Sequence, residues 1–298
     1  TPAALQRKGV RRFVQERLVR LGIPLLAFGF LLGPLAVALA GAPATGEVGA
    51  RWWRDVSQGR FVIGPLWFAW ALLLFTLGFA AWRQLRPEPA PEGARPIPPS
   101  SSWWLAAMGV GAVSLGLRQV VPVGETVLGL QLGYFSSYVF LFALGCIASR
   151  HRWLERLERR QAALWARVTL CTLPLLFVVA ALSGALGGRP VNFAGGLGLP
   201  AVVYAFWEPF VAWGVIATLL VRFRERVDAP SARWQAWGAQ AYGAFIVHAP
   251  VLVGISVALA SWDVWPLLKF GVVGSFSVVA SFVMAALLLR LPGARRVL

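Results

Sequence analysis

Long apolar runs separated by short polar segments repeat along the whole chain. At a rise of 1.5 Å per residue, each run is long enough to cross a hydrocarbon layer about 30 Å thick as an α-helix. Prolines occur in or at the ends of several runs, and membrane helices tolerate them where neighbouring groups bond the freed backbone. The pattern predicts eight membrane-spanning helices, at residues 21–40, 62–82, 103–121, 133–149, 164–183, 200–221, 239–260 and 266–289.

The composition indicates an all-α, polytopic membrane helical bundle. Of the 298 residues, 58% are hydrophobic and only 13% are charged, whereas a soluble domain carries about 25% charged residues. The 28 Lys and Arg residues against 12 Asp and Glu would suit a nucleic-acid-binding protein. Basic loops on one side of a membrane explain the excess better. We therefore predict the lipid bilayer, and no nucleic acid, as a partner.

The basic residues alternate between the two sides of the predicted bundle. The N-terminus, the loops at 83–102, 150–163 and 222–238, Arg167 and the C-terminus hold 22 of the 28 basic residues. By the positive-inside rule we expect both termini of this chain to be cytoplasmic. The predicted even number of helices agrees, because it places both termini on one side. The scarcity of lysine and abundance of alanine suggest a GC-rich bacterial gene, hence the bacterial inner membrane. We expect one domain over 1–298, with a Pro-rich cytoplasmic linker at 86–102.

Three polar residues inside the apolar runs are candidates for a functional site, because ionisable groups in a membrane are costly. They are His248, Glu208 and Arg118. Their depths along their helices predict that they share a cavity in the outer half of the bundle, with Gln131 and Tyr134 nearby. The sequence gives the depth of each residue along its helix, but not the direction in which its side chain points around the helix axis. His248 could equally be a structural histidine bonded across helices, and Arg118 could extend to the interface.

Arg17 and Arg20 lie at the cytoplasmic end of the first helix in an R-x-x-R spacing. The plain interpretation is a topological anchor. Alternatively, two guanidinium groups at i and i+3 of one helix face could hold phosphates. The chain shows no phosphate-binding glycine loop, no metal-ligand spacing and no nucleophile motif of the common soluble enzymes, so no metal or bound cofactor is expected.

Several stretches, in their order along nearly the whole chain, resemble the integral-membrane acyltransferase family 3, which includes bacterial O-acyltransferases and the periplasmic glucan succinyltransferase branch. The matching stretches are Arg11-Arg12-Phe13, Glu16 to Pro24 with its R-x-x-R, Gly64 to Phe68, Leu130 to Phe135 and Phe142 to Gly145, Trp207 to Phe210, and Ala241 to Pro250.

The resemblance implies a bundle of about ten helices that moves an acyl group from acyl-CoA to a hydroxyl of a cell-surface or periplasmic glycan. It implies that Arg17 and Arg20 bind the CoA phosphates, that Arg118 and Gln131 bind substrate, and that Glu208 and His248 support the chemistry. The family's arginine and histidine pair, with the proposed catalytic base, has no match in this chain. We expect it in two preceding helices, so the catalytic residue is unknown and this chain alone is expected to be inactive.

Two other functions fit the same residues. A transporter or flippase for a lipid-linked sugar also needs charges at mid-depth, although it has no use for phosphate-binding arginines at one end. A non-catalytic membrane subunit is the second alternative. Loss of acyl-CoA binding on changing Arg17 and Arg20 to Ala would favour the enzyme.

Overall fold

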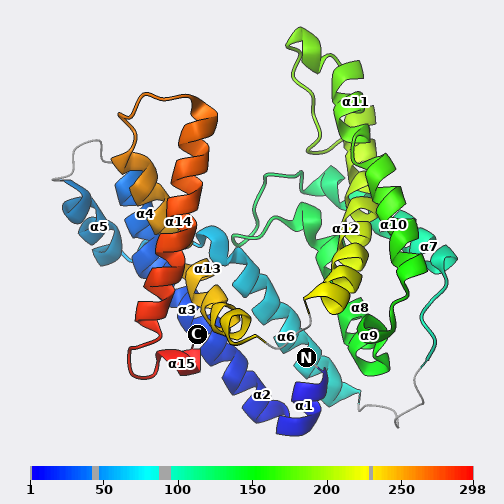
Figure 1. Ribbon diagram of the computed structural model, residues 1–298, viewed down its shortest axis with the longest axis horizontal. Helices are drawn as coiled ribbons and strands as arrows, with labels where there is room; N and C mark the ends of the chain where they lie inside the picture. Colours follow the sequence, from blue (N-terminus) through cyan, green and yellow to red (C-terminus); the bar gives the residue numbers. More distant parts are fainter. Residues whose placement is uncertain (1, 42–46, 87–94, 228–230, 298) are drawn as a thin grey trace. The chain divides into compact units, whose positions relative to one another are not determined.

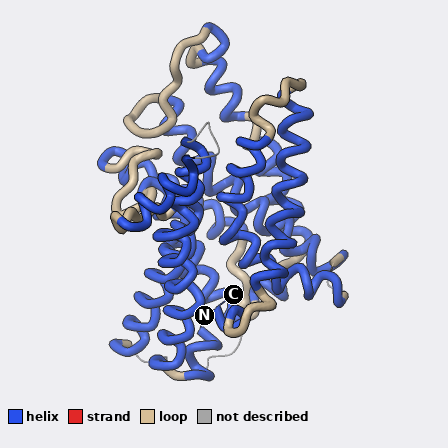
Figure 2. Tube along the Cα trace, turned by 90° about the vertical axis from the view of Figure 1, so that its left-hand side faces the viewer, coloured by secondary structure: helices blue, strands red, loops and turns tan. Residues whose placement is uncertain are grey.

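The structure is a computed structural model and describes residues 2–41, 47–86, 95–227 and 231–297. Within these ranges the regular elements are helices (Figure 2), and the one pairing of strand type is an isolated bridge between Val127 and Leu130. The chain divides into two compact units. The central unit holds residues 1–7 and 86–229, and the terminal unit holds residues 8–85 and 230–298. Each is described by itself.

Within the described residues, seven helical segments are long and apolar enough to cross a membrane. They are Val10–Gly41, Gly64–Leu85, Leu132–His151, Arg159–Leu182, Leu199–Arg226, Ala232–Ala258 and Pro266–Leu288. The chain is therefore a multi-pass membrane protein. The predicted count of eight is too high by one. The segment 103–121 does form a helix, α7 (Ser100–Val120), but it begins with three serines and ends with Arg118 and Gln119, which lowers its apolarity.

The terminal unit contains two membrane segments from each end of the chain. The first segment runs through α2 (Val10–Arg17), α3 (Ile23–Ala27) and α4 (Gly33–Gly41) with two π-helical turns, η1 (Leu18–Gly22) and η2 (Phe28–Leu32). The unit also holds the short α5 (Val48–Ser57) and α15 (Ala294–Val297), together with α6 (Trp67–Leu85), α13 (Ala232–Ala258) and α14 (Pro266–Leu288).

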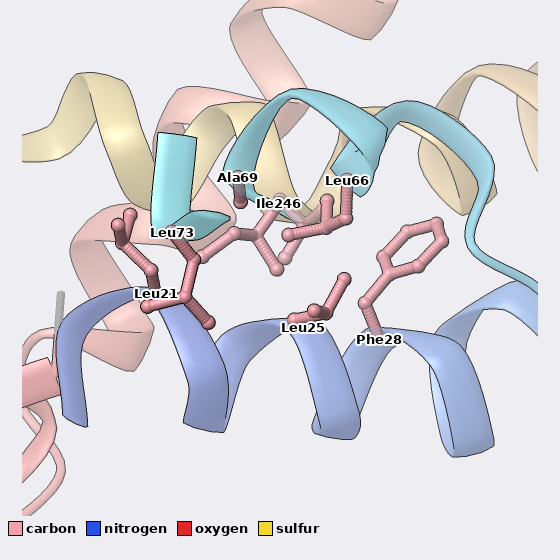
Figure 3. Packing of buried hydrophobic residues seen from close by; sticks show 8 residues of the cluster. Leu21, Leu25, Phe28, Leu66, Ala69, Leu73 and Ile246 are labelled. Carbon is pink, nitrogen blue, oxygen red and sulfur yellow. The ribbon is translucent and has the colours of Figure 1, made fainter. Parts of the chain in front are cut away.

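A buried cluster joins three helical segments of the terminal unit. Leu21, Leu25 and Phe28 of the first segment point toward Leu66, which directly precedes α6, and toward Ala69 and Leu73 of α6 (Figure 3). Ile246 of α13 completes the cluster. The spacing of the first three residues places them on one helix face. This packing positions α13, which carries His248, within the terminal unit.

The π turns lie beside prolines, and other groups bond the carbonyls freed there. Pro24 has no N–H and so leaves the carbonyl of Arg20, four residues earlier, without its helical donor. The hydroxyl of Tyr242 donates to that carbonyl at 3.0 Å. In η2, the N–H of Val62 donates to the carbonyl of Gly29 at 2.9 Å. Neighbouring segments thus satisfy a backbone that helix geometry alone would leave unbonded.

The central unit is built on α7, α8 (Phe135–His151), α10 (Arg159–Thr172) and α12 (Leu199–Arg226), with the shorter α1 (Pro2–Lys8), α9 (Trp153–Arg156) and α11 (Leu175–Leu182). In Figure 1, α12 packs against both α7 and α10, and α7 packs against α8. Trp165 is fully buried at their centre, where its ring stacks near Phe210.

The predicted Pro-rich linker at 86–102 is shorter than expected. Residues 87–94 lie outside the described residues. Residues 95–99 have no regular structure, which suits prolines that cannot donate backbone hydrogen bonds. Helix α7 then begins at Ser100, so the last three residues of the predicted linker are helical. The prediction of a single domain over 1–298 stays a prediction.

Gly214 allows α12 to approach α10 closely. A Cβ atom at this position would meet the carbonyl oxygen of Trp165 and the hydroxyl of Thr169. Because a backbone oxygen cannot swing aside as a side chain can, Gly214→Val is expected to destabilise the protein by about 1–3 kcal/mol. Thermal unfolding in detergent measures the change. Gly109→Val is the matched control, since a Cβ atom there meets nothing within 4 Å. Equal melting temperatures for the two variants would contradict this packing.

Candidate functional site

The central unit contains a buried ion pair between two membrane helices. The Nη2 atom of Arg118, near the end of α7, donates to Oε2 of Glu208 on α12. The Nε atom of Arg118 also donates to the carbonyl of Gly133 at 3.0 Å. The Arg118 side chain is 1% exposed and that of Glu208 is 16% exposed. The arginine is therefore fixed, and the carboxylate remains partly accessible.

Two tyrosines enclose the guanidinium group. Its Cζ atom lies 4.8 Å from the ring centre of Tyr204 and 5.3 Å from that of Tyr134, within the range of cation–π attraction. The hydroxyls of the two tyrosines lie 3.2 Å apart. Because the rings replace water around the charge, the cage and the carboxylate together lower the cost of burying Arg118.

Local sequence explains how these groups meet. Tyr204 and Glu208 are four residues apart on α12 and therefore share one face of that helix. Tyr134 ends the 3-10 turn η5 (Leu132–Tyr134), directly before α8. Ser114 of α7 hydrogen bonds to Ser136 of α8. The N–H of Val123 donates to the carbonyl of Ala194 at 2.8 Å, which holds the following loops together at the same end.

One nitrogen of the cage has no partner. Nη1 of Arg118 is buried and, within the described part of the chain, no hydrogen-bond acceptor lies within reach. A buried N–H donor without an acceptor costs about 1–3 kcal/mol, and more in a charged group. The site can recover that cost when an oxygen atom of a bound molecule accepts from Nη1.

The structure brings together Arg118, Glu208 and Tyr134, as their depths predicted. Gln131 is exposed. Its backbone carbonyl accepts from the N–H of Tyr134 at 3.2 Å, so the residue contributes to the turn that positions Tyr134. Tyr204 was missed by sequence reasoning, although its i, i+4 relation to Glu208 on a membrane helix was a usable signal.

His248 lies on α13, in the terminal unit, and its ring is half-buried. Its Nδ1 atom lies 2.6 Å from the carbonyl oxygen of Phe245, one turn earlier. Because a carbonyl only accepts, Nδ1 carries the proton. In the neutral ring Nε2 is then an acceptor. The hydrogen bond is within its own helix, whereas the structural interpretation of the sequence expected one across helices.

We expect His248→Ala to lower the activity of the full-length protein without preventing membrane insertion, because α13 keeps its other core packing. A loss of about 10- to 100-fold is the size expected for a residue that supports catalysis without being its base. Turnover by purified variant and wild-type protein checks this, with equal melting temperatures as the control. Turnover equal to that of the wild type would make His248 a packing residue.

Arg17 and Arg20 lie at the junction of α2 and the π turn η1, in the terminal unit. Glu16, the acidic residue next to them in sequence, is paired with Lys8 and Arg12. Within the described residues Arg17 and Arg20 form no ion pair, although Arg17 lies 5.1 Å from the ring centre of Phe13. A π turn has more residues per turn than an α-helix, so the two side chains diverge more than the predicted i, i+3 face.

The described residues contain no group of three or more His, Cys, Asp and Glu side chains that could hold a metal ion. Of the residues that the sequence singled out, the Arg118–Glu208 pair lies in the central unit, and His248, Arg17 and Arg20 lie in the terminal unit. Their chemistry is hydrogen bonding to oxygen, proton acceptance and attraction of anions.

A comparison with protein-family models matches residues 3–286 to a model described as an acyltransferase domain. Searches of curated proteins and of solved structures find no match to this chain. The match spans nearly the whole chain, including every motif that carried the resemblance. The chain belongs to the integral-membrane acyltransferase family 3, and it is a membrane acyltransferase.

Proposed function

We propose that this protein is a membrane O-acyltransferase that moves an acyl group from acyl-CoA to a hydroxyl of a cell-surface or periplasmic glycan. The observation that carries the proposal is the buried Arg118–Glu208 pair, with one guanidinium nitrogen left to donate, in a chain of an acyltransferase family. Family membership favours an enzyme over the alternative of a lipid-linked sugar transporter.

The proposed role of Arg118 follows from the charge that acyl transfer develops. When a hydroxyl attacks a thioester, negative charge appears on the former carbonyl oxygen, and fixed donors in a dry site stabilise it. Arg118 is held by Gly133, Glu208 and two aromatic rings, so it needs no rearrangement to donate from Nη1. Removal of one such donor costs about 10²–10³ in turnover.

Glu208 is proposed to hold Arg118 and to orient the acceptor hydroxyl. The Glu208 carboxylate accepts from Nη2 of Arg118, so orientation by hydrogen bonding is the role proposed for it. Together with His248, it remains a supporting residue, and no residue of this chain is assigned as the catalytic base.

A pocket beside Tyr204 is the proposed place for the acceptor. It has a volume of about 440 Å³, and its lining includes Asn192, Phe193 and Tyr204. The Phe193 and Tyr204 rings lie edge to face, 6.1 Å apart. Tyr204 lines this pocket and also contacts the Arg118 guanidinium group. A hydroxyl bound in the pocket is therefore separated from Nη1 of Arg118 by the Tyr204 side chain. The positive-inside rule puts this end of the helices outside the cytoplasm, where glycans occur.

The donor is proposed to bind at the opposite side of the membrane. Within the described residues neither Arg17 nor Arg20 forms an ion pair, and guanidinium groups suit phosphate oxygens. Acyl-CoA, a cytoplasmic anion with several phosphates, is the donor that fits this end.

The proposal is tested by mass spectrometry of envelope glycans from cells with and without the protein. We expect a mass increase equal to one acyl group on the glycan of producing cells, removed by mild alkali as an ester requires. Cells that produce the Arg118→Lys variant should show about 100-fold less. Identical glycans in all strains, with the protein correctly inserted, would contradict the proposed function.

A further inference from the structure

A second site occurs in the central unit, at the end of the helices away from the Arg118–Glu208 pair. It begins with an apolar pocket of about 430 Å³ between α7, α8 and α12. Its walls are almost entirely aliphatic and aromatic, with Trp103, Phe140, Leu144, Trp213 and Leu220 among them. This size and lining are typical of pockets that bind small apolar groups.

A basic pocket adjoins the apolar one. It has a volume of about 690 Å³, and its ionisable lining residues are Arg156, Arg160, Arg167 and Glu158. The two pockets share Ile97 and Pro98 as lining residues. Leu157, which lines the apolar pocket, is followed directly by Glu158, which lines the basic one. An apolar cavity and a net positive cavity therefore meet at one wall.

That wall is held in place by specific bonds. Trp153 Nε1 donates to the carbonyl of Arg95 at 3.0 Å, and Nη1 of Arg156 donates to the same oxygen at 3.2 Å. The side-chain amide of Gln161 donates to the carbonyl of Pro98 at 3.2 Å. The segment 95–99 is thus pinned across the ends of α8, α9 and α10, and the two pockets have a fixed boundary.

The charges of the basic pocket are only partly used by the protein. Arg156 bonds to the wall, and Arg167 donates through Nε to the carbonyl of Ala163 at 3.3 Å in its own helix. Among the described residues Arg160 forms no ion pair, and Glu158 is the single acidic side chain in the lining. Two or more guanidinium groups can therefore face an anion.

We propose that the joined pockets bind an anionic phospholipid of the inner leaflet, with one acyl chain in the apolar pocket and the phosphate in the basic pocket. The order of the two pockets matches the order of a lipid, because the apolar one lies among residues of α7, α8 and α12, and the basic one lies between the segment 96–99 and the first turns of α10. Basic pockets between helices on the cytoplasmic side bind anionic headgroups.

A phospholipid fits better than a soluble ligand. The apolar pocket lies between the end of α8 and the last apolar turns of α12, which the basic loops place in the cytoplasmic leaflet. A lipid reaches it by lateral movement, without crossing water. This inference is independent of the proposed function, because it requires neither acyl-CoA nor transfer.

Two variants test the two halves of the site. Arg160→Gln with Arg167→Gln removes charge from the basic pocket, and Arg222→Gln with Arg226→Gln removes the same charge from exposed positions outside its lining. Gly145→Leu fills the apolar pocket, since a Cβ atom there meets nothing within 4 Å, and Gly109→Leu is the matched control on an open helix face.

Native mass spectrometry of the purified protein measures bound lipid, with phosphatidylglycerol and phosphatidylcholine of identical acyl chains as probes. We expect phosphatidylglycerol to bind more tightly. We expect about 30-fold weaker binding in the Arg160/Arg167 variant, the loss expected of two basic residues near a membrane surface. We also expect loss of binding in Gly145→Leu, while both control variants bind as the wild type does.

Equal binding of the two lipids would overturn the proposal, as would equal loss in the test and control variants. Oleoyl-CoA is a competitor with the same chain and more phosphates. If it displaces phosphatidylglycerol at a lower concentration than phosphatidylglycerol itself needs, the site belongs to the acyl donor and the phospholipid assignment is overturned. Melting temperatures in detergent identify any variant that fails to fold.

Discussion

Arg118→Met is expected to lower the free energy of unfolding by about 3 kcal/mol and to abolish acyl transfer. The substitution leaves the Glu208 carboxylate without a partner between membrane helices, and breaking a buried pair costs about 3–5 kcal/mol. The lower value applies because Glu208 is 16% exposed, so solvent can reach its carboxylate and reduce the cost of leaving it unpaired. Thermal unfolding in detergent and turnover of the same preparation measure the two effects.

A double-mutant cycle separates the ion pair from the packing. Arg118→Met with Glu208→Gln is expected to be more stable than the sum of the single changes predicts, by about 1–3 kcal/mol. Strict additivity would mean that the two side chains do not interact. Arg118→Lys keeps the charge but cannot bond to Gly133 and Glu208 with a planar fork. We expect it to fold and to lose turnover, which distinguishes the catalytic donor from the structural charge.

Replacing both Arg17 and Arg20 by Ala is expected to weaken acyl-CoA binding by at least about 100-fold. A hydrogen bond between charged groups contributes about 1.5–3 kcal/mol, which is about tenfold or more for each arginine. Titration of purified protein with a fluorescent acyl-CoA analogue measures the dissociation constant.

The matched control removes the same charge from the start of α2. Arg11→Ala with Arg12→Ala changes two exposed residues, and the pair that Arg12 forms with Glu16 is a surface contact of 3.6 Å with little effect on stability. We expect this control variant to bind acyl-CoA less than about threefold more weakly than the wild type, because it loses only long-range electrostatic attraction, which salt screens. Equal weakening in both variants would show that binding depends on net charge and that Arg17 and Arg20 form no site.

The all-helical membrane fold was predictable because long apolar runs have few alternatives in a bilayer. The miscounted segment is instructive. Residues 103–121 form a helix, but serines, glycines and Arg118 lower the apolarity of α7, so it is not among the segments long and apolar enough to cross a membrane. The π turns before Pro24 and Pro34 were not predictable from periodicity, because the groups that bond their free carbonyls, Tyr242 and Val62, are distant in sequence.

The sequence predicted the depth of the candidate site in the membrane, but only some of the residues that form it. Depth along each helix placed Arg118 and Glu208 in the same outer half of the bundle, and the structure pairs them. Tyr204 and the carbonyl of Gly133 complete the surroundings of Arg118. Neither could be predicted from depth along a helix, because helix packing decides which side chains face one another. The lack of an acceptor for Nη1 of Arg118 could not be predicted from the sequence. It depends on the positions of all the neighbouring acceptors, which only the folded structure gives.

The central claim is that an acyl group passes from cytoplasmic acyl-CoA to a hydroxyl on the outer side. Proteoliposomes with the full-length protein test it directly, with acyl-CoA labelled in its acyl group on the side of Arg17 and Arg20, and acceptor glycan on the other side. The account predicts alkali-labile label in the glycan, with free CoA released in equal amount, and about 100-fold less of both with Arg118→Lys. Two results would contradict the claim. In the first, the label crosses the membrane without becoming attached to glycan; in the second, the glycan crosses the membrane while the acyl-CoA remains intact.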